Sequence, residues 1–248
     1  MVYLSFRATL FDQAQGLRTI FGVVSAQIYF TAWQALPVIT VVACATGAIV
    51  IMQSSFQMSL LGAGGDIVGK VLVIAIIREI GPLLTALIVI ARSGTAVASE
   101  LGTLKANREI EALETMGINP LSYIVFPRIL GGMLSVLCLA FFFDITALFG
   151  GYLVSALVQD RPFYFFVDSL AAAFQFEDMW LFLLKNGFSG LIIFVISCSQ
   201  GLKVKQSLHE VPQVTSKAVV NSLAYVIAFH LIVSLLFYLN QLSRLGVI

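Results

Sequence analysis

The chain has 248 residues, of which 59% are hydrophobic and 11% are charged, and its mean hydropathy is +0.98. Soluble domains carry about 45–50% apolar and about 25% charged residues, so this composition excludes an ordinary water-soluble domain. A formal net charge of +1 provides no basic field that would recruit nucleic acid. Since no linker-like tract interrupts the chain, residues 1–248 are predicted to form one domain.

The N-terminal segment, residues 1–28, is predicted to form an amphipathic interfacial helix. Phe6, Leu10 and Leu17 share one helical face, whereas Asp12 lies on the opposite face. A helix of this kind lies along the cytoplasmic leaflet with its apolar side in the lipid. The same pattern also fits a helix that packs on a soluble partner.

Five stretches are apolar for about the 20 residues that a helix needs to cross roughly 30 Å of hydrocarbon. They run over residues 33–52, 71–91, 129–158, 179–199 and 218–239. Unpaired backbone groups are costly in lipid, so these stretches are predicted to be helices rather than strands. The predicted fold class is an all-α integral membrane protein with five transmembrane helices.

The basic residues of the loops predict the orientation of these helices. One set of loops carries Arg7, Arg18, Arg92, Lys105, Arg108, Arg128, Lys203, Lys205 and Lys217, and the other carries Lys70, Arg161 and Arg244. The positive-inside rule places the richer set in the cytoplasm. The N-terminus is therefore expected inside and the C-terminus outside.

The second predicted span is interrupted by the run Arg78-Glu79-Ile80-Gly81-Pro82. Charges at that depth are costly unless they are paired or face a polar cavity, and Pro82 removes a backbone hydrogen bond. Arg78 could meet an anionic lipid headgroup while Glu79 balances it. Alternatively, the two charges could be buried partners for other helices and so fix the geometry of the bundle.

Asp144 and His230 are the other ionisable residues singled out within predicted spans. A proton relay through Glu79, Asp144 and His230 would suit an ion-coupled transporter. Because each residue stands alone without a local motif, a hydrogen-bonded packing role fits them equally well.

The loop between the second and third spans, residues 94–117, is predicted to form two short helices that meet near Ala106-Asn107. Asn107 is expected to cap the second helix, and Gly117 is expected to end it. We name residues 94–117 the elbow. A capped elbow on the cytoplasmic face would provide a docking surface for another protein, although a solvated loop would also satisfy the pattern.

Motifs for catalysis or metal binding are not evident in the sequence. The run from Gly64 to Lys70 resembles the start of a phosphate-binding loop, but Val71 replaces the Ser or Thr that would hold magnesium. His209 and His230 have no cysteine or carboxylate at metal-ligand spacing. The chain is therefore expected to be non-catalytic and to bind no metal or cofactor.

Several motifs give the chain a resemblance to a known family. They are residues 53–63 (QSSFQMSLLGA), 78–82 (REIGP), 91–94 (ARSG), 99–105 (SELGTLK), 111–120 (EALETMGINP) and 127–128 (PR). This ordered set resembles the MlaE/YrbE permeases of MCE-type ABC lipid transporters. The match is densest over residues 78–132. At His230, where family members often carry an acidic residue, the chain departs from the pattern.

The resemblance implies a homodimeric permease of the bacterial inner membrane, with its N-terminus cytoplasmic and its C-terminus periplasmic. The implied partners are a cytoplasmic ABC ATPase that binds ATP and magnesium, a periplasmic MCE-domain protein, and a small accessory cytoplasmic subunit. The implied cargo is phospholipid or another hydrophobic lipid.

The resemblance also implies roles for particular residues. Those expected at the lipid cavity are Arg78, Glu79, Phe56, Met58 and Leu61, and those expected to couple to the ATPase through the elbow are Glu100, Lys105, Arg108, Glu109, Glu111, Glu114 and Met116. An ion-coupled carrier that uses Arg78, Glu79, Asp144 and His230 remains the alternative, as does a membrane enzyme acting on lipid.

Overall fold

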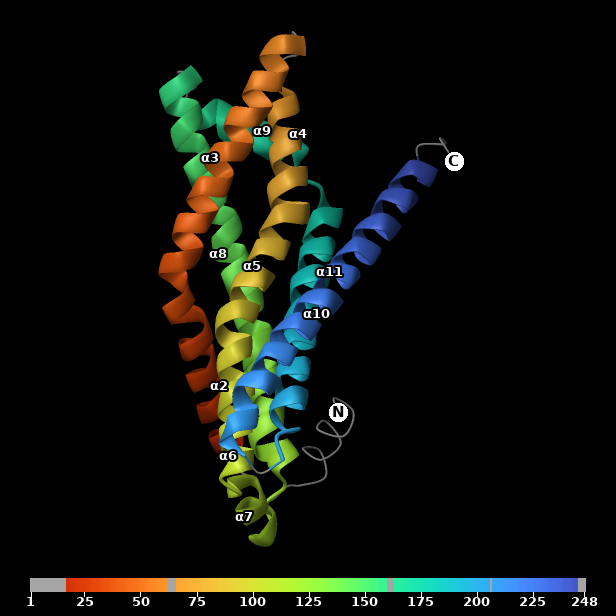
Figure 1. The fold of residues 1–248 in the computed structure, drawn as a ribbon. Helices are drawn as coiled ribbons and strands as arrows, with labels where there is room; N and C mark the ends of the chain where they lie inside the picture. The colour runs from red at the N-terminus through yellow and green to blue at the C-terminus, as the bar shows by residue number, and fades with distance from the viewer. Residues whose placement is uncertain (1–16, 62–65, 160–162, 206, 245–248) are drawn as a thin grey trace. The chain divides into compact units, whose positions relative to one another are not determined.

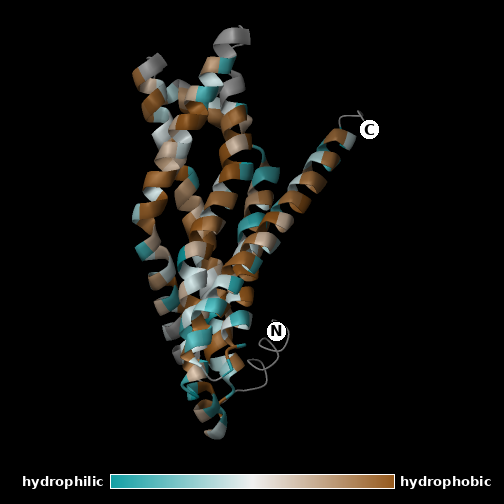
Figure 2. Cartoon of the chain, viewed as in Figure 1, coloured by the Kyte–Doolittle hydropathy of each residue, from teal (hydrophilic) through white to brown (hydrophobic). Residues whose placement is uncertain are grey.

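The computed structural model describes residues 17–61, 66–159, 163–205 and 207–244, and within these ranges the chain forms helices and no strand (Figure 1). Five helical runs are long and apolar enough to cross a membrane, namely Val24–Gln57, Gly69–Ala106, Leu121–Leu157, Phe176–Gly201 and Leu208–Arg244. Hydrophobic residues dominate these runs (Figure 2). The five-span prediction is confirmed, although most of the helical runs extend beyond the predicted stretches because helical geometry continues past the most apolar window.

The first run consists of α2 (Leu17–Ala32), the 3₁₀ turn η1 (Trp33–Ala35) and α3 (Leu36–Leu61). Residues 1–16 of the predicted interfacial helix lie outside the described residues. The apolar span already begins at Val24, within the segment expected to lie at the interface. The interfacial placement of residues 1–28 therefore stays a prediction.

The second run combines α-helical and π-helical segments, which are α4 (Asp66–Leu72), η2 (Val73–Ile80), α5 (Gly81–Val89), η3 (Ile90–Gly94) and α6 (Thr95–Ala106). In η2, a π-helix, the Gly81 N–H donates to Ile76 O, five residues back. Pro82 has no N–H to continue the α-helical pattern. The interruption predicted at Pro82 is thus a π-helical stretch.

The elbow contains the two predicted helices, α6 and α7 (Glu109–Thr115). However, Asn107 does not cap α7: its N–H donates to Thr103 O and it ends α6, so the predicted capping role was wrong. Arg108 adopts a left-handed conformation with φ 60°, which makes the bend, and Gly117 with φ +78° follows the end of α7 as predicted. Because α6 continues the second run, the elbow is not separate from that span.

The remaining elements are η4 (Leu121–Val125), α8 (Phe126–Gln159), α9 (Phe163–Ala173), α10 (Phe176–Gly201), η5 (Leu208–Glu210) and α11 (Val211–Arg244). Helix α9, which was not predicted from the sequence, has 11 residues and is too short to span hydrocarbon.

By its contacts the chain divides into two compact units. The first comprises residues 1–35, 86–136 and 187–248, and the second comprises residues 36–85 and 137–186. In the first unit α6 packs on α11, and Gly201 of α10 lies so close to α6 that a Cβ would stand 2.8 Å from Ala98 O. Small residues at the crossing therefore allow close contact between helices.

In the second unit α4 packs on α9, and α3 packs closely on α8. A Cβ on Gly47 would stand 1.8 Å from Ala147 O, so no other residue fits without moving the backbone. Gly150 also lies close to α3, since a Cβ there would stand 2.7 Å from Cys44 Cα. This unit holds Arg78 and Glu79 of the second span.

Candidate functional site

Arg78 and Asp178 form a buried ion pair inside the second unit. Arg78 Nε lies 2.6 Å from Asp178 Oδ1, and their side chains are only 5% and 0% exposed. Arg78 comes from η2 and Asp178 from the first turn of α10. Charges at such burial are tolerated in proteins when each is paired.

Lys185 and Glu79 form a second ion pair beside the first. Lys185 Nζ lies 3.0 Å from Glu79 Oε2 and also donates to Arg78 O at 2.6 Å. Arg78 O is the carbonyl that a residue at position 82 would bond in an α-helix, but Pro82 has no N–H. The ammonium of Lys185 thus satisfies a backbone carbonyl that Pro82 leaves open.

We name Arg78, Glu79, Asp178 and Lys185 the charged cluster. Arg78 and Glu79 each pair with a different charge on α10, which fits the alternative that they are buried partners for other helices. A role of the two residues in contact with a lipid headgroup stays a prediction. Lys185 was missed, although it lies within the fourth predicted span and the rule for intramembrane charges identifies it.

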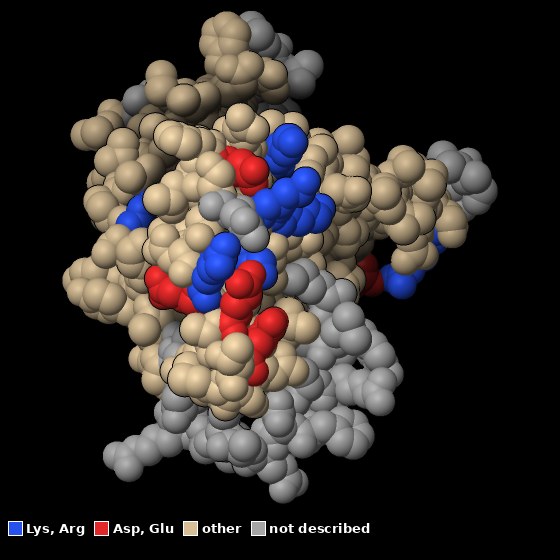
Figure 3. All heavy atoms as spheres, turned by 60° about the horizontal axis from the view of Figure 1, so that its bottom comes forward, with Lys and Arg blue, Asp and Glu red and all other residues tan. Residues whose placement is uncertain are grey.

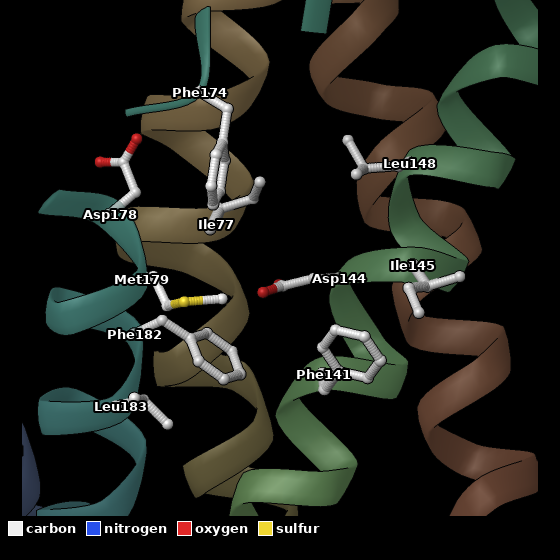
Figure 4. A pocket seen from close by; sticks show the side chains of 10 residues that line it. All are labelled: Ile77, Phe141, Asp144, Ile145, Leu148, Phe174, Asp178, Met179, Phe182 and Leu183. Carbon is white, nitrogen blue, oxygen red and sulfur yellow. The ribbon is translucent and has the colours of Figure 1, made fainter. Parts of the chain in front are cut away.

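Asp178 also borders an apolar pocket of about 340 Å³ between η2, α8 and α10 (Figure 4). Of the other residues expected at a lipid cavity, Phe56 lies on α3 with 66% of its surface exposed. Met58 and Leu61 also belong to α3, but their side chains lie outside the described residues. The structure therefore brings Arg78 and Glu79 together with two unforeseen charges, and of the described residues Phe56 is not among the pocket's lining.

The residues considered for a proton relay have separate surroundings. Ser189 Oγ lies 2.8 Å from His230 Nε2 in the first unit, and both side chains are buried. Asp144, in the second unit, makes no hydrogen bond or ion pair with any residue that the structure describes. A continuous hydrogen-bonded relay through Asp144 is therefore not formed by these described residues.

The elbow carries charges of both signs at the end of the first unit where α7 lies (Figure 3). Lys105 Nζ lies 3.4 Å from Glu111 Oε1, and Arg128 Nη2 lies 2.6 Å from Glu100 Oε1. The carboxylate side chains of these pairs are the accessible ones, since Glu100 is 59% exposed and Glu111 is 46% exposed, whereas Arg128 is only 11% exposed. Glu100 and Glu111 can therefore contact a partner at this surface.

Beside these charges, α7 has a small surface groove of about 190 Å³. Glu109 and Met116 line it together with apolar residues, and Met116 is 65% exposed. Arg108 and Glu114 are exposed as well. A groove with an exposed apolar side chain and a charged rim has the composition of a protein-binding surface.

The segment that resembles a phosphate-binding loop has a different structure where it is described. Lys70 belongs to α4, a helix rather than a loop, and its side chain is exposed. Gly64 and Gly65 lie outside the described residues. Residues 66–69, which would have to form the loop around a phosphate, are already helical in α4, so Lys70 lacks the preceding loop with which such a lysine holds phosphate.

A helical chain with five spans, buried ion pairs within them and a two-helix elbow between two of the spans has the features of the membrane-spanning subunit of a transporter. Comparison with known families agrees, since the sequence model described as Permease MlaE matches residues 24–236. The chain belongs to this MlaE permease family and is a multi-pass membrane protein. Membership of an ABC transporter permease family implies an ATPase partner.

Individual relatives support the same family. A probable ABC transporter permease protein of Rickettsia conorii is 32% identical over 212 residues, which cover 86% of this chain and 82% of the relative. A probable ABC transporter permease protein of Pyropia yezoensis is 30% identical over 79% of this chain and 74% of its own length. The chloroplastic protein TRIGALACTOSYLDIACYLGLYCEROL 1 of Arabidopsis thaliana is 30% identical over 69% of this chain and 49% of its own length.

Proposed function

We propose that this permease moves phospholipid or another hydrophobic lipid between the inner membrane and a periplasmic MCE-domain protein, driven by ATP hydrolysis in a separate subunit. The observation that carries the proposal is the charged cluster, which is buried in spanning helices and borders an apolar pocket. The name of the Arabidopsis relative, which is that of a galactolipid, supports a lipid cargo.

The chemistry of the cluster suits a lipid headgroup. It combines two cations and two anions, so it can meet the phosphate of a lipid with Arg78 or Lys185 and an ammonium with Glu79 or Asp178. The Glu79 side chain is 34% exposed and is therefore the most accessible member. In this proposal, a passing headgroup exchanges partners with the cluster while the lipid tails contact apolar helix surfaces.

The elbow is proposed as the surface that receives the ATPase. The expected assembly has two copies of the permease, two ATPase chains that bind ATP and magnesium, and a small accessory cytoplasmic subunit. Glu100, Lys105, Arg108, Glu109, Glu111, Glu114 and Met116 are the proposed coupling residues. Their mixed charge and the exposed Met116 provide the polar rim and apolar centre that a transient interface needs.

Reconstitution tests this function directly. We expect the permease to co-purify with its ATPase and, in proteoliposomes, to transfer a fluorescent phospholipid to purified MCE-domain protein only when ATP is hydrolysed. Lys70→Ala is the matched control and should leave ATP hydrolysis unchanged, whereas the phosphate-loop lysine of the ATPase should be essential. Transport by the permease alone, driven by an ion gradient, would instead support the carrier alternative.

The orientation in the inner membrane is a second proposal, based on the excess of basic residues in one set of loops. Single cysteines at Asn107 and Asn240, introduced after replacement of Cys44, Cys138 and Cys198, should report opposite sides. We expect a membrane-impermeant maleimide to label Asn240→Cys in spheroplasts and to label Asn107→Cys only after the inner membrane is opened. Equal labelling of both in intact spheroplasts would contradict the five-span orientation.

A further inference from the structure

The pocket between η2, α8 and α10 has the character of a binding site for an apolar chain. Its volume of about 340 Å³ lies within the roughly 300–1,000 Å³ of small-molecule pockets. Ile77, Phe141, Leu148 and Phe182 are among its apolar lining residues (Figure 4). All three helices that form it are parts of runs long and apolar enough to cross a membrane, so an apolar lipid chain is the occupant that its surroundings favour.

Asp144 is a carboxylic side chain in the otherwise mostly apolar lining of this pocket. Its side chain is only 7% exposed, and its carboxyl group points from α8 into the space between α8 and α10 (Figure 4). Asp144 has no hydrogen bond or ion pair with a described residue, unlike Asp178, which is held by Arg78. Burying a polar group without such a partner costs on the order of 2–7 kcal/mol, so a partner from outside the chain is expected.

The second span provides room for this carboxyl group at Gly81. A Cβ at Gly81 would stand 2.2 Å from Asp144 Oδ1, which no side chain could tolerate without displacing the carboxyl group. The same glycine follows η2 and donates its N–H to Ile76 O. The close approach of Asp144 therefore depends on Gly81, the residue that directly follows the π-helical stretch η2.

We propose that this pocket binds the acyl chain of a membrane lipid whose polar end carries a free hydroxyl group, and that this hydroxyl hydrogen-bonds to Asp144. A hydroxyl group can donate to a carboxylate and can also accept from a carboxylic acid, so it satisfies Asp144 in either protonation state. An amine cation only donates and an ester only accepts. The chain enters beside Phe141 and Ile145, which are 61% and 52% exposed on α8.

This site adjoins the charged cluster of the proposed transport path, since Asp178 lines the pocket, but binding of a lipid there needs neither ATP nor release of the lipid. The test uses the full-length permease with its ATPase in nanodiscs without nucleotide, so that binding is measured apart from transport. The probe is monopalmitoylglycerol with a photoactivatable diazirine in its chain. Methyl palmitate with the same diazirine is the matched probe, since it has the chain and an ester but no hydroxyl group.

We expect monopalmitoylglycerol to label the pocket segments of α8 and α10 several times more strongly than methyl palmitate. Asp144→Leu should lower labelling by monopalmitoylglycerol about tenfold, as loss of one hydrogen bond to a buried group implies. Asp144→Asn should keep labelling within about threefold, because an amide can also pair with a hydroxyl group. Co-purified ATPase and the melting temperature report whether each variant is folded.

Two further variants keep the test decisive if Asp144→Leu does not fold. Ile145→Trp narrows the pocket without touching Asp144 and should reduce labelling by both probes, whereas Phe149→Trp lies one turn farther along α8, outside the lining, and should not. Equal labelling of wild-type protein by the two probes would overturn the proposal, because it would show that the pocket binds any apolar chain and does not recognise the hydroxyl group. Loss of labelling in Asp144→Asn, with the fold retained, would show that a hydroxyl group is not what the side chain at position 144 recognises, and would overturn the proposal.

Discussion

Asp178→Ala should abolish lipid transfer and strongly destabilise the permease, because it removes the carboxylate that lies 2.6 Å from the buried Arg78 guanidinium. Breaking a buried ion pair by deleting one member costs about 3–5 kcal/mol. We expect Arg78→Ala to be similarly destabilising, since it deprives Asp178 of the same interaction. Thermal unfolding of the purified complex, measured beside ATP-dependent lipid transfer, checks both effects.

A matched control and a double variant separate stability from transport. Glu177→Ala removes an acidic side chain from the neighbouring position on α10, but this side chain is exposed, so stability and transfer should change little. Replacing both partners, in Arg78→Met with Asp178→Leu, should restore most of the stability because two apolar side chains need no ion pair. If this double variant also restores lipid transfer, the charged cluster is structural and its proposed role in headgroup contact is wrong.

Glu114→Lys should detach the ATPase from the permease while leaving the permease folded. Glu114 is exposed on α7 and makes no ion pair with a described residue, so its reversal disturbs no internal pair. A charge of the wrong sign at a docking surface costs about 1–3 kcal/mol per desolvated contact, which predicts roughly a 5- to 150-fold loss of affinity. The ratio of ATPase to permease after purification, with ATP hydrolysis by the complex, is the measurement.

Glu111→Lys should be more severe, because the new ammonium group would also lie beside Lys105, which pairs with Glu111 at 3.4 Å. Asp168→Lys is the matched control, since it makes the same charge change at an exposed position on α9. It should leave ATPase binding intact. Normal ATPase recovery from both elbow variants would show that the elbow does not dock the ATPase.

Much of the architecture could be predicted because lipid solvation imposes simple rules. Length and hydropathy identify five spans, and Gly117 marks the end of α7 through its left-handed conformation. Arg78 and Glu79 could be recognised from the sequence as intramembrane charges. These inferences rest on properties of short segments, which the sequence displays directly.

Pairing between distant segments could not be predicted in the same way. Arg78 and Asp178 are far apart in sequence, and their contact depends on how η2 rotates its side chains toward α10. The misassigned cap at Asn107 has a similar origin, since the left-handed conformation of Arg108 delays the start of α7. Helix α9 was missed because its 11 residues are too few for a span and carry no strong capping signal.

The spacing of the charged cluster along α10 limits how the two helices can move. Asp178 and Lys185 are seven residues apart, which is close to two helical turns, so they share one face of α10 and differ in height by about 10 Å. Arg78 and Glu79 are consecutive and so lie at nearly the same height on η2. Their ion-pair partners, Asp178 and Lys185, lie about two turns apart on α10. Axial sliding of α10 by one turn, about 5.4 Å, would pull on both ion pairs at once. Within this unit the two helices should translate together along the membrane normal and change register only when both ion pairs open.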